Sequence, residues 1–548
     1  MSLPVLSRDA MRAWERDSWA AGRNVQSVIQ RVGWRLARWL AEHSRARDSI
    51  LLLAGPGHNG DDVRAAVPVL ADRDVEIITV RDPSAVFDCV RLALRSPRRW
   101  VVDGLFGIGL NRPLDGAWRR IIEAVNACEW PVAAMDVPSG LDADSGQPLG
   151  EAIHATHTLT VGAPKPGLIV EAASPWVGRL EVLNGVGLIE PPVPATGAPV
   201  WLEERDFAGY PPQRASSSHK GSHGHAVILA GSLGYHGAAV LAARGALSMR
   251  PGLVTVLTLP SVYSAVAAQM AAPLVGLWKG VDSIPASATS LVVGPGLAAP
   301  ECEILQEAIA RCWQRLDLPM VVDASALAWL PQGRVESREP RLLTPHPGEA
   351  GRLIGITAGE VQGGRPETLR EVSKTFGQSW VILKGRHTLI GRTTGSLGIN
   401  GTGSPSMAQG GTGDVLAGMA GGLLAQREAR GDLFKLAAFA AWEHGRRADL
   451  LDQVRPHWIA EDLAILGAGV LGKDPAFDFQ KRPETSGCGP PRRNEHGGAS
   501  QFRNRIKLLG DKSPKSNQKK ASQKQVKANV ATQKKNQAIA SQQASKKK

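Results

Sequence analysis

The stretch "NGTGSPSMAQGGTGDVLAG", residues 400–418, gathers six glycines around a single acid, Asp414, and leads directly into an apolar run. Glycine loses more conformational entropy on folding than any other residue, so such a cluster needs a physical reason. One interpretation is a flexible linker. The other is a helix N-terminus whose free N–H groups receive a phosphate, with Asp414 beside the reacting group.

The residues after Asp414 favour the helix. Val415, Leu416 and Met419 have the apolar spacing of a helix that faces a core. A glycine-lined turn lets backbone N–H groups approach an anion closely, and the helix dipole favours negative charge at that end. Asp414 itself suits either of two roles, a helix cap or a general base that accepts a proton from a hydroxyl.

Apolar runs that end in a glycine or proline turn recur in two parts of the chain. Up to about residue 190 they are "SILLLAGPG", "VEIITV", "RRWVVDGLFG", "WPVAAMDVPSG" and "ATHTLTVGAPK". Between residues 212 and 470 they include "GHAVILAGS", "GLVTVLTLP", "TSLVVGPG", "PMVVDASAL" and "SWVILKG". Strands of this continuous kind are typical of parallel sheets with helices on both faces. The sequence therefore predicts an α/β protein with two doubly wound, three-layer α/β domains.

Two changes of composition set the predicted domain boundaries. The proline-rich "IEPPVPATGAPVW", residues 189–201, indicates a linker, so we place domains at 1–195 and 212–472 with a linker at 196–211. Residues 473–548 are rich in Lys, Gln and Ser, and no aromatic residue follows Phe502. Such a segment cannot bury enough apolar surface to offset the entropy of ordering, which predicts a disordered tail.

The net charge of +13 resides in this tail. From Lys481 onward there are 18 Lys or Arg against three acids, which leaves the first 480 residues at −2. A lysine-rich tail is able to contact RNA or DNA weakly through their phosphates, although a solubilising extension is the simpler interpretation. No apolar run reaches 18 residues, and the N-terminus lacks the apolar core of a signal peptide. The five scattered cysteines fit inert thiols, so we expect a cytoplasmic protein without a membrane span.

Several motifs of the second part resemble one known family. "GGTGDVLAG" is similar to the anion-binding and catalytic-acid motif of the ribokinase-like superfamily. Together with "KGSHGHAVILAGS", "VVGPGL", "LTPHPGEAGRLIG" and "VILKGRHTLI", it resembles the ADP/ATP-dependent NAD(P)H-hydrate dehydratases. The resemblance implies a ribokinase-like domain that uses nucleotide hydrolysis to remove water from hydrated nicotinamide cofactors, NADHX and NADPHX.

The same resemblance implies roles for single residues. Asp414 would act on the C6 hydroxyl of the hydrate, and Gly413 would lie at the nucleotide, ADP or ATP. Lys384 suits phosphate as a point charge, and Mg²⁺ is implied because it bridges transferred phosphates. Gln409 stands where the family usually has serine or threonine, a change that we expect to be tolerated. The implied nucleotide-binding turn is completed by Gly385, Arg386, His387 and Thr388, and the implied substrate contacts are Ala238, Gly296 and His346.

Three turns of the first part each carry an Asp or Asn at a strand end, where α/β sheets bind ligands. The stretches "GPGHNGDDVRAAVPVL", "VVDGLFGIGLNRPLDG" and "MDVPSGLDADSG" resemble the NAD(P)H-hydrate epimerases, which are often fused ahead of the dehydratase. The resemblance implies a Rossmann-like domain with Asp136 as proton shuttle between the R and S hydrates. The implied K⁺ ligands are Asn59, Asp103 and Ser139, and the implied substrate contacts are His58, Asn59, Gly60, Asp61, Asp62, Gly107, Ile108, Gly109, Leu110, Asn111, Arg112, Pro113 and Asp136.

One motif departs from the epimerase pattern. The family reads GPGNNGGDG, whereas this chain has Asp61 and Val63 at two of the glycines. A β-branched Val63 would suit a left-handed backbone poorly, and the charge of Asp61 would oppose a passing pyrophosphate. We therefore expect a weakened epimerase half that mainly scaffolds the dehydratase.

Two other functions stay open at this stage. A vitamin-precursor kinase of the same superfamily would release a phosphorylated product. A non-catalytic protein would sense nucleotides with its α/β domains and nucleic acid with its tail. The sequence leaves the choice between ADP and ATP open. Because oligomers are common for such folds, a homo-oligomer is a candidate state.

Overall fold

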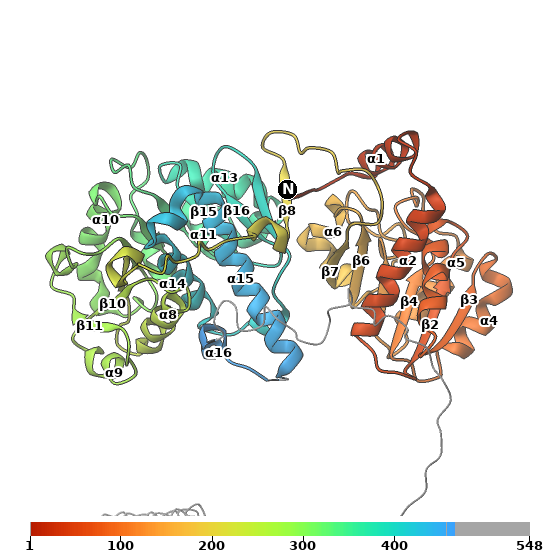
Figure 1. The fold of residues 1–548 in the computed structure, drawn as a ribbon, viewed down its shortest axis with the longest axis horizontal. Coiled ribbons are helices and arrows are strands. Elements are labelled where there is room, and N and C mark those ends of the chain that lie inside the picture. The colour runs from red at the N-terminus through yellow and green to blue at the C-terminus, as the bar shows by residue number, and fades with distance from the viewer. Residues whose placement is uncertain (1, 456, 466–548) are drawn as a thin grey trace, which may run out of the picture. The chain divides into compact units, whose positions relative to one another are not determined.

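The computed structural model describes residues 2–455 and 457–465, so the predicted tail at 473–548 lies outside the described residues. Two sheets organise this part of the chain (Figure 1). The smaller sheet has six strands, all parallel, in the order β3-β2-β4-β5-β6-β7. They are β2 (Ser49–Ala54), β3 (Asp74–Thr79), β4 (Trp100–Gly104), β5 (Val132–Met135), β6 (His157–Val161) and β7 (Arg179–Leu183).

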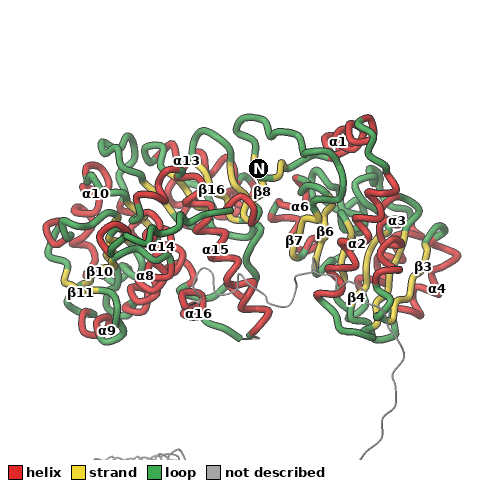
Figure 2. The backbone as a smooth tube through the Cα atoms, in the orientation of Figure 1, coloured by secondary structure: helices red, strands yellow, loops and turns green. Residues whose placement is uncertain are grey.

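Both faces of this sheet are covered by helices, which explains why its strands β2 and β5 are apolar at nearly every position. Ile50 and Leu52 of β2 belong to a core with α2 (Val25–Glu42) and α3 (His58–Ala66). Leu51 and Leu53 belong to a separate core with α4 (Pro83–Ala93) and α5 (Gly116–Asn126). Figure 2 shows these strands between helices. The remaining helices of this part are α1 (Arg8–Ala20), α6 (Pro166–Ile169) and α7 (Ser174–Val177).

The larger sheet has eleven strands in the order β1-β8-β17-β16-β15-β14-β13-β12-β9-β10-β11. The run from β15 to β11 is parallel throughout, whereas β16 is antiparallel to both of its neighbours. The strands are β1 (Leu3–Pro4), β8 (Pro199–Leu202), β9 (His225–Leu229), β10 (Leu253–Thr258), β11 (Leu274–Leu277), β12 (Ser290–Val293), β13 (Met320–Val322), β14 (Arg341–Leu343), β15 (Trp380–Leu383), β16 (Thr388–Gly391) and β17 (Leu397–Asn400). The prediction of a mixed α/β protein with large parallel sheets is confirmed.

The passage expected to be a linker, 196–211, contributes a strand of its own. β8 pairs with β17 and with β1 from the N-terminus. Val200, Trp201 and Leu202 are buried, so three consecutive apolar side chains outweigh the proline signal that surrounds them. Pro199 stands at the first position of the strand, where a missing N–H is tolerated.

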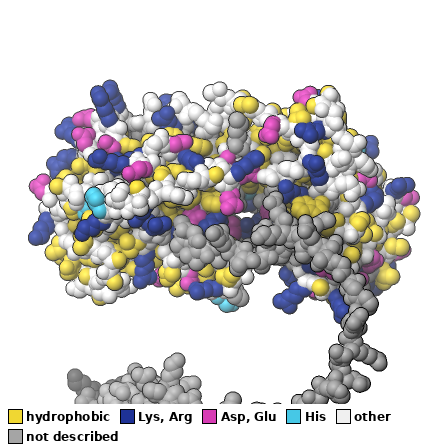
Figure 3. Space-filling model, in the orientation of Figure 1, with side chains coloured by type: hydrophobic (Ala, Val, Ile, Leu, Met, Phe, Trp, Pro, Cys, Tyr) yellow, Lys and Arg dark blue, Asp and Glu magenta, His cyan; other side chains and the backbone are white. Residues whose placement is uncertain are grey.

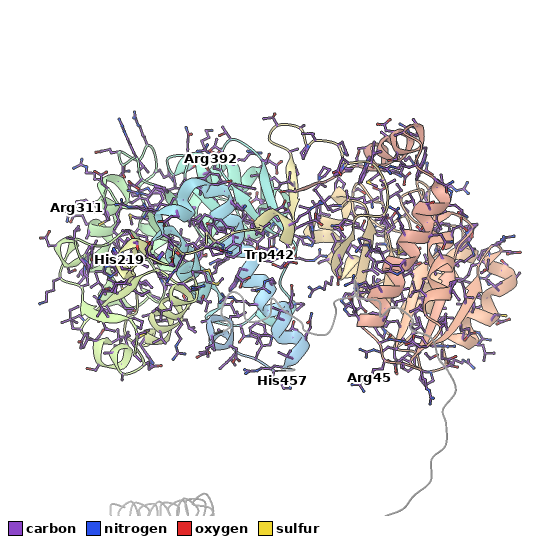
Figure 4. The ribbon with its side chains drawn as sticks, viewed as in Figure 1. Arg45, His219, Arg311, Arg392, Trp442 and His457 are labelled. Carbon is purple, nitrogen blue, oxygen red and sulfur yellow. The ribbon has the colours of Figure 1, made fainter. Side chains whose placement is uncertain are left out.

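Helices also cover both faces of the larger sheet. Figure 4 labels Trp442 of α15, whose ring centroid lies 5.0 Å from that of Phe207 in one of the two cores. On the face shown in Figure 3, basic and acidic side chains are interspersed. No helix within the described ranges is both long and apolar enough to span a bilayer. The helices are α8 (His236–Ser248), α9 (Tyr263–Ala267), α10 (Gln306–Arg315), α11 (Pro347–Ile354), α12 (Ala358–Gly363), α13 (Arg365–Thr375), α14 (Thr412–Leu424), α15 (Leu433–Val454) and α16 (Ala460–Ile465).

Glycine lets α14 and α8 pack with their backbones nearly in contact. A Cβ on Gly418 would overlap the carbonyl group of Ala242, and one on Gly245 would overlap that of Val415. α8 is otherwise rich in alanine, and both helices are buried along most of their length. The glycines after Asp414 therefore seat α14 against α8, which fixes where its N-terminus lies.

We predict that Gly418→Ala lowers the free energy of unfolding by about 1–3 kcal/mol, the usual cost of overpacking a core. The matched control is Gly237→Ala on α8, where a Cβ meets nothing within 4 Å in the described part of the chain. That variant should lie within about 1 kcal/mol of the parent, as helix propensity alone predicts. Urea unfolding measures both, and equal effects would refute the packing argument.

Candidate active sites

A cavity of about 840 Å³ opens at the carboxyl ends of the smaller sheet's strands. It is lined by residues that follow β2, β4 and β5, which is where ligands bind in parallel sheets. Gly60 and Asp61 lie outside its lining, although both were predicted to contact substrate. The predicted residues that line it are His58, Asn59, Asp62, Gly107, Ile108, Gly109, Leu110, Asn111, Arg112, Pro113 and Asp136.

Three of the lining residues that were missed from the sequence come from α1 and α5. Arg12 and Glu15 come from α1, and Trp118 comes from α5. Nothing in the pattern of α1 indicates that it reaches this cavity, because its apolar spacing is that of any surface helix. The Phe106 ring packs edge-on against Trp118 at 4.6 Å, so Trp118 closes one wall with an aromatic pair.

The residues predicted to hold K⁺ form one connected group. Ser139 donates from its hydroxyl to Asp103 at 2.6 Å and from its backbone N–H to the other carboxylate oxygen at 2.8 Å. Asn59 donates to the Phe106 carbonyl at 2.8 Å, and the same carbonyl accepts from the Ser139 hydroxyl. The Asn59 Oδ1 atom is buried without a hydrogen-bond partner among the described residues. An orphaned amide oxygen beside a carboxylate and a hydroxyl is an oxygen donor set of the kind that hard cations prefer.

Asp136 is held in an unusual conformation at the end of β5. Its φ of 65° lies in the left-handed region, which aspartate visits more readily than most residues. The ammonium group of Lys165 donates to Asp136 Oδ1 at 2.6 Å. Oδ2 accepts the Ile108 N–H at 3.3 Å, from the turn that lines the cavity. The predicted proton shuttle is therefore present and fixed from two sides.

Two further carboxyl groups share this cavity. Burial, reinforced by the charge of Asp136, raises the pKa of Asp62 well above its usual value. Burial and Asp136 likewise raise the pKa of Glu15. Burial also raises the pKa of Asp103 to about 6, against hydrogen bonds from Ser139 that lower it. The cavity thus places two carboxyl groups with raised pKa values, Asp62 and Glu15, near Asp136.

The two departures from the epimerase motif are accommodated, contrary to expectation. Val63 lies within α3 and is fully buried, and it is not among the residues with positive φ. Its side chain fills the space over Gly104 of β4, where a Cβ would overlap it. Asp61 is 44% exposed and pairs with Arg64 at 2.8 Å, outside the cavity. The helical backbone and this outward pairing remove both reasons for a weakened epimerase.

The second candidate site lies where α14 begins. Gly411 is the N-cap residue with φ of 98°, and Asp414 stands in the first turn. The Lys384 ammonium group lies 3.4 Å from where a Cβ on Gly413 would stand. The predicted trio of Asp414, Gly413 and Lys384 is therefore assembled at a helix N-terminus suited to anions.

The sequence analysis missed Asp323, which follows β13 beneath this turn. Its Oδ1 atom accepts the Lys384 ammonium group at 2.8 Å and the Thr344 hydroxyl at 2.8 Å. Lys384 also lies 3.8 Å from Glu349 Oε2 on α11. Although burial alone would lower it, the charges of Asp323 and Glu349 raise the pKa of Lys384. An Asp after an apolar strand, in "PMVVDASAL", was the available signal.

The three residues predicted to contact substrate in this half lie in two places. Ala238 and Gly296 meet, since a Cβ on Gly296, where φ is 67°, would stand 2.7 Å from that of Ala238. His346 caps α11 in a reciprocal box with Glu349, and burial lowers its pKa.

The residues of the predicted nucleotide-binding turn, 384–388, also differ in their surroundings. Gly385 has φ of 133°, and the Thr388 hydroxyl donates to its carbonyl at 2.9 Å. Arg386 donates to the carbonyl of Gly178, and His387 contacts that of Ile169. Of this turn, only Lys384 is shown beside Gly413, so nucleotide contacts by the other four stay a prediction.

Asp414 has the chemistry of a general base. Burial, followed by the negative charge of Asp323, raises its pKa to about 7 despite the nearby Lys384. A carboxylate with a pKa close to neutral accepts a proton more strongly than an ordinary aspartate. The buried His444 of α15 donates to the Thr412 carbonyl and so supports the backbone just before Asp414.

Comparisons with known proteins identify relatives of both halves. A family model described as NAD(P)H-hydrate dehydratase matches residues 226–464, and one described as YjeF-related protein N-terminus matches residues 84–167. A bifunctional NAD(P)H-hydrate repair enzyme of Gloeobacter violaceus is 34% identical over 493 residues, covering 82% of this chain and 92% of its own. Another, of Coxiella burnetii, is 35% identical over 371 residues, covering 65% and 74%.

A solved structure also resembles the second half. It is the ADP/ATP-dependent NAD(P)H-hydrate dehydratase of Bacillus subtilis, co-crystallized with ATP/Mg²⁺, at 32% identity and a TM-score of 0.44. The match covers 48% of this chain and 95% of that one.

The raised pKa of Asp414 gives a stability prediction. The pKa is about 7 in the folded protein against 3.8 for a free side chain, so ionisation costs the folded state more than the unfolded one. Below about pH 4 Asp414 is neutral in both the folded and the unfolded state and imposes no penalty on the fold. The free energy of unfolding then falls as the pH rises, and above about pH 7 the full penalty of ionisation is present. Asp414→Asn should therefore raise the melting temperature at pH 8 more than at pH 5.

Asp142→Asn is the control of opposite sign. Although burial opposes them, hydrogen bonds from Ser145 and the charge of Arg8 lower the pKa of Asp142. Its ionised form therefore stabilises the fold at pH 8, and the amide should lower the melting temperature there. Thermal unfolding without ligand measures both variants. A pH-independent effect of Asp414→Asn would contradict the assignment.

Proposed function

The chain belongs to the family of bifunctional NAD(P)H-hydrate repair enzymes, and from this premise we propose what each of its two sites does. The site on the smaller sheet epimerises the R and S forms of NADHX and NADPHX. The site at the start of α14 dehydrates the S form to NADH or NADPH and consumes ADP or ATP. The observation that supports this most directly is the partly buried Asp414 beside Gly413 and Lys384.

Dehydration needs a better leaving group than hydroxide, which the nucleotide supplies. Asp414 takes the proton of the C6 hydroxyl while that oxygen attacks the terminal phosphoryl group. The new O–P bond forms as the nucleotide leaves one phosphate shorter. The C6–O bond then breaks, a proton leaves C5, and the products are the dihydronicotinamide and inorganic phosphate.

The N-terminus of α14 and Lys384 supply the charge for this step. Free N–H groups at Gly411–Gly413 face an anion, and the helix dipole favours it. Within the described ranges no cluster of three His, Cys, Asp or Glu side chains forms a metal site. Mg²⁺ bound mainly through phosphates needs only one or two carboxylates, and Glu349 would provide one, while the ion would neutralise charge on the transferred group.

Epimerisation inverts C6 by opening the ring: Asp136 takes the proton of the C6 hydroxyl as the C6–N1 bond breaks and N1 gains a proton, and the reverse steps close the ring on the other face of C6. Asp62 and Glu15 lie in the same cavity, where burial, followed by the charge of Asp136, raises the pKa of each. Asn59, Asp103 and Ser139 would hold K⁺, whose charge would attract the substrate's phosphates. We further propose a cytoplasmic homo-oligomer, as inferred from the sequence.

The decisive test mixes the full chain with racemic NADHX, Mg²⁺, K⁺ and either ADP or ATP, and follows NADH by its near-ultraviolet absorbance. We expect complete conversion, because the structure accommodates Asp61 and Val63. Asp414→Asn, which keeps the shape and removes the base, is the control that should stay inactive.

Each of the other outcomes would show which part of the proposed function is wrong. Conversion that stops near half would mean a working dehydratase beside an inactive epimerase. No conversion, with a phosphorylated vitamin precursor formed instead, would revive the kinase.

The pH dependence of dehydration tests the base assignment. Activity should rise with a midpoint near pH 7, since Asp414 acts only when ionised. Asp323→Asn removes a negative charge and frees Lys384, and both changes move the midpoint to lower pH. Thr344→Val removes only a hydrogen bond to Asp323 and should leave the midpoint in place. An unchanged midpoint in Asp323→Asn would exclude this electrostatic coupling.

A further inference from the structure

Lys165 is a buried cation that belongs to none of the three epimerase-like motifs and lies outside the cavity lining. Its side chain is 0% exposed, and it stands between Pro164 and Pro166 at the N-terminus of α6. The ammonium group donates to Asp136 Oδ1 at 2.6 Å, to the Thr160 hydroxyl at 2.8 Å and to the Val161 carbonyl at 2.9 Å. An ammonium group has three protons, so every one of them has an acceptor.

These contacts make the two oxygens of Asp136 unequal. Besides Lys165, Oδ1 accepts the Val161 N–H at 3.1 Å and a longer contact from the Thr160 hydroxyl. Oδ2 accepts, among the described residues, only the long bond from Ile108. It lies 3.0 Å from where a Cβ on Gly107 would stand, against the turn that lines the cavity. One oxygen is therefore fully engaged while the other faces the ligand space.

The surrounding backbone gives Lys165 little freedom to move. Gly162 before it has φ of 74°, and the Pro164 carbonyl accepts the N–H of Leu6 at 2.9 Å. A buried ammonium group that left Asp136 would lose its charge partner, which costs several kcal/mol. Asp136 in turn needs external support, since its left-handed backbone persists only where the surroundings determine it.

From this geometry we propose that Lys165 is the positioning residue of the epimerase site. It engages Oδ1 of Asp136 and so presents Oδ2 to the C6 oxygen of the substrate. Lys165 does not itself touch the substrate and acts through Asp136. This inference rests on the proposed epimerase function of the cavity.

The test uses the full chain and R-NADHX, with an excess of a separate dehydratase so that epimerisation limits NADH formation. Lys165→Met should lower kcat about 100-fold, the order expected when a reacting group is misplaced by about 1 Å. KM should change less than threefold, because Lys165 lies outside the cavity. Dehydration of S-NADHX by the same chain is the internal control for folding and should be preserved.

A matched pair on β6 keeps the proposal testable if Lys165→Met fails to fold. Thr160→Val removes a hydroxyl that contacts both Lys165 and Asp136, and it should lower kcat of epimerisation several-fold. Thr158→Val removes an equally buried hydroxyl on the same strand that donates instead to the Val177 carbonyl at 2.7 Å. It should leave that kcat within twofold of the parent.

Several results would overturn the proposal. Lys165→Met with unchanged kcat would exclude the role of Lys165 alone. Equal effects of Thr160→Val and Thr158→Val, or losses that parallel the dehydratase activity, would reduce Lys165 to a structural residue. A parent chain that dehydrates S-NADHX but never epimerises R-NADHX would overturn the epimerase function itself, and the role of Lys165 with it.

Discussion

A buried aspartate paired with a lysine recurs at the strand ends of both sheets, and the two sites depend on it. Asp136 follows β5 and pairs with Lys165 at 2.6 Å, and Asp323 follows β13 and pairs with Lys384 at 2.8 Å. Removing either partner would leave an uncompensated buried charge, which is far more costly than the intact pair. Each pair therefore fixes the backbone at the end of its strand, where the neighbouring turn has to meet a ligand.

The sequence predicted the strands and the turns but not these pairs. "SILLLAGPG" and "GGTGDVLAG" are local patterns, and they predicted β2 and the N-terminus of α14. Asp323 and Lys384 are 61 residues apart, so only the strand order brings them together. Arg12 and Glu15 were missed for the same reason, because α1 precedes the first strand of its sheet by a whole helix. Local pattern finds residues at strand ends, whereas partners across strands need the fold.

The motif sequence also led to a wrong expectation where the residues that contact the motif in the fold were unknown. Val63 replaces a glycine of the family pattern, and a steric conflict was the natural inference. In the fold Val63 of α3 packs against Gly104 of strand β4, and this glycine leaves room for the valine side chain. The proline-rich passage at 189–201 misled similarly, since the burial of Val200 and Trp201 outweighed its turn signals. Whether a substitution is tolerated depends on the residues that it contacts in the fold rather than on its position in the motif.

Each site contains an aspartate–lysine ion pair, but the pair has a different effect in each site. In the first, the lysine is bound directly to Asp136, so it orients the group that we propose to react. In the second, Lys384 is engaged by Asp323, and Asp414, the proposed base, experiences the negative charge of that same Asp323. Had Lys384 paired with Asp414 instead, its charge would have stabilised the carboxylate and made it a weaker base. Because the lysine is committed elsewhere, Asp414 keeps a pKa of about 7 at a helix N-terminus that would otherwise lower it. The position of Lys384 thus decides whether Asp414 has the chemistry of a strong base or only that of a helix cap.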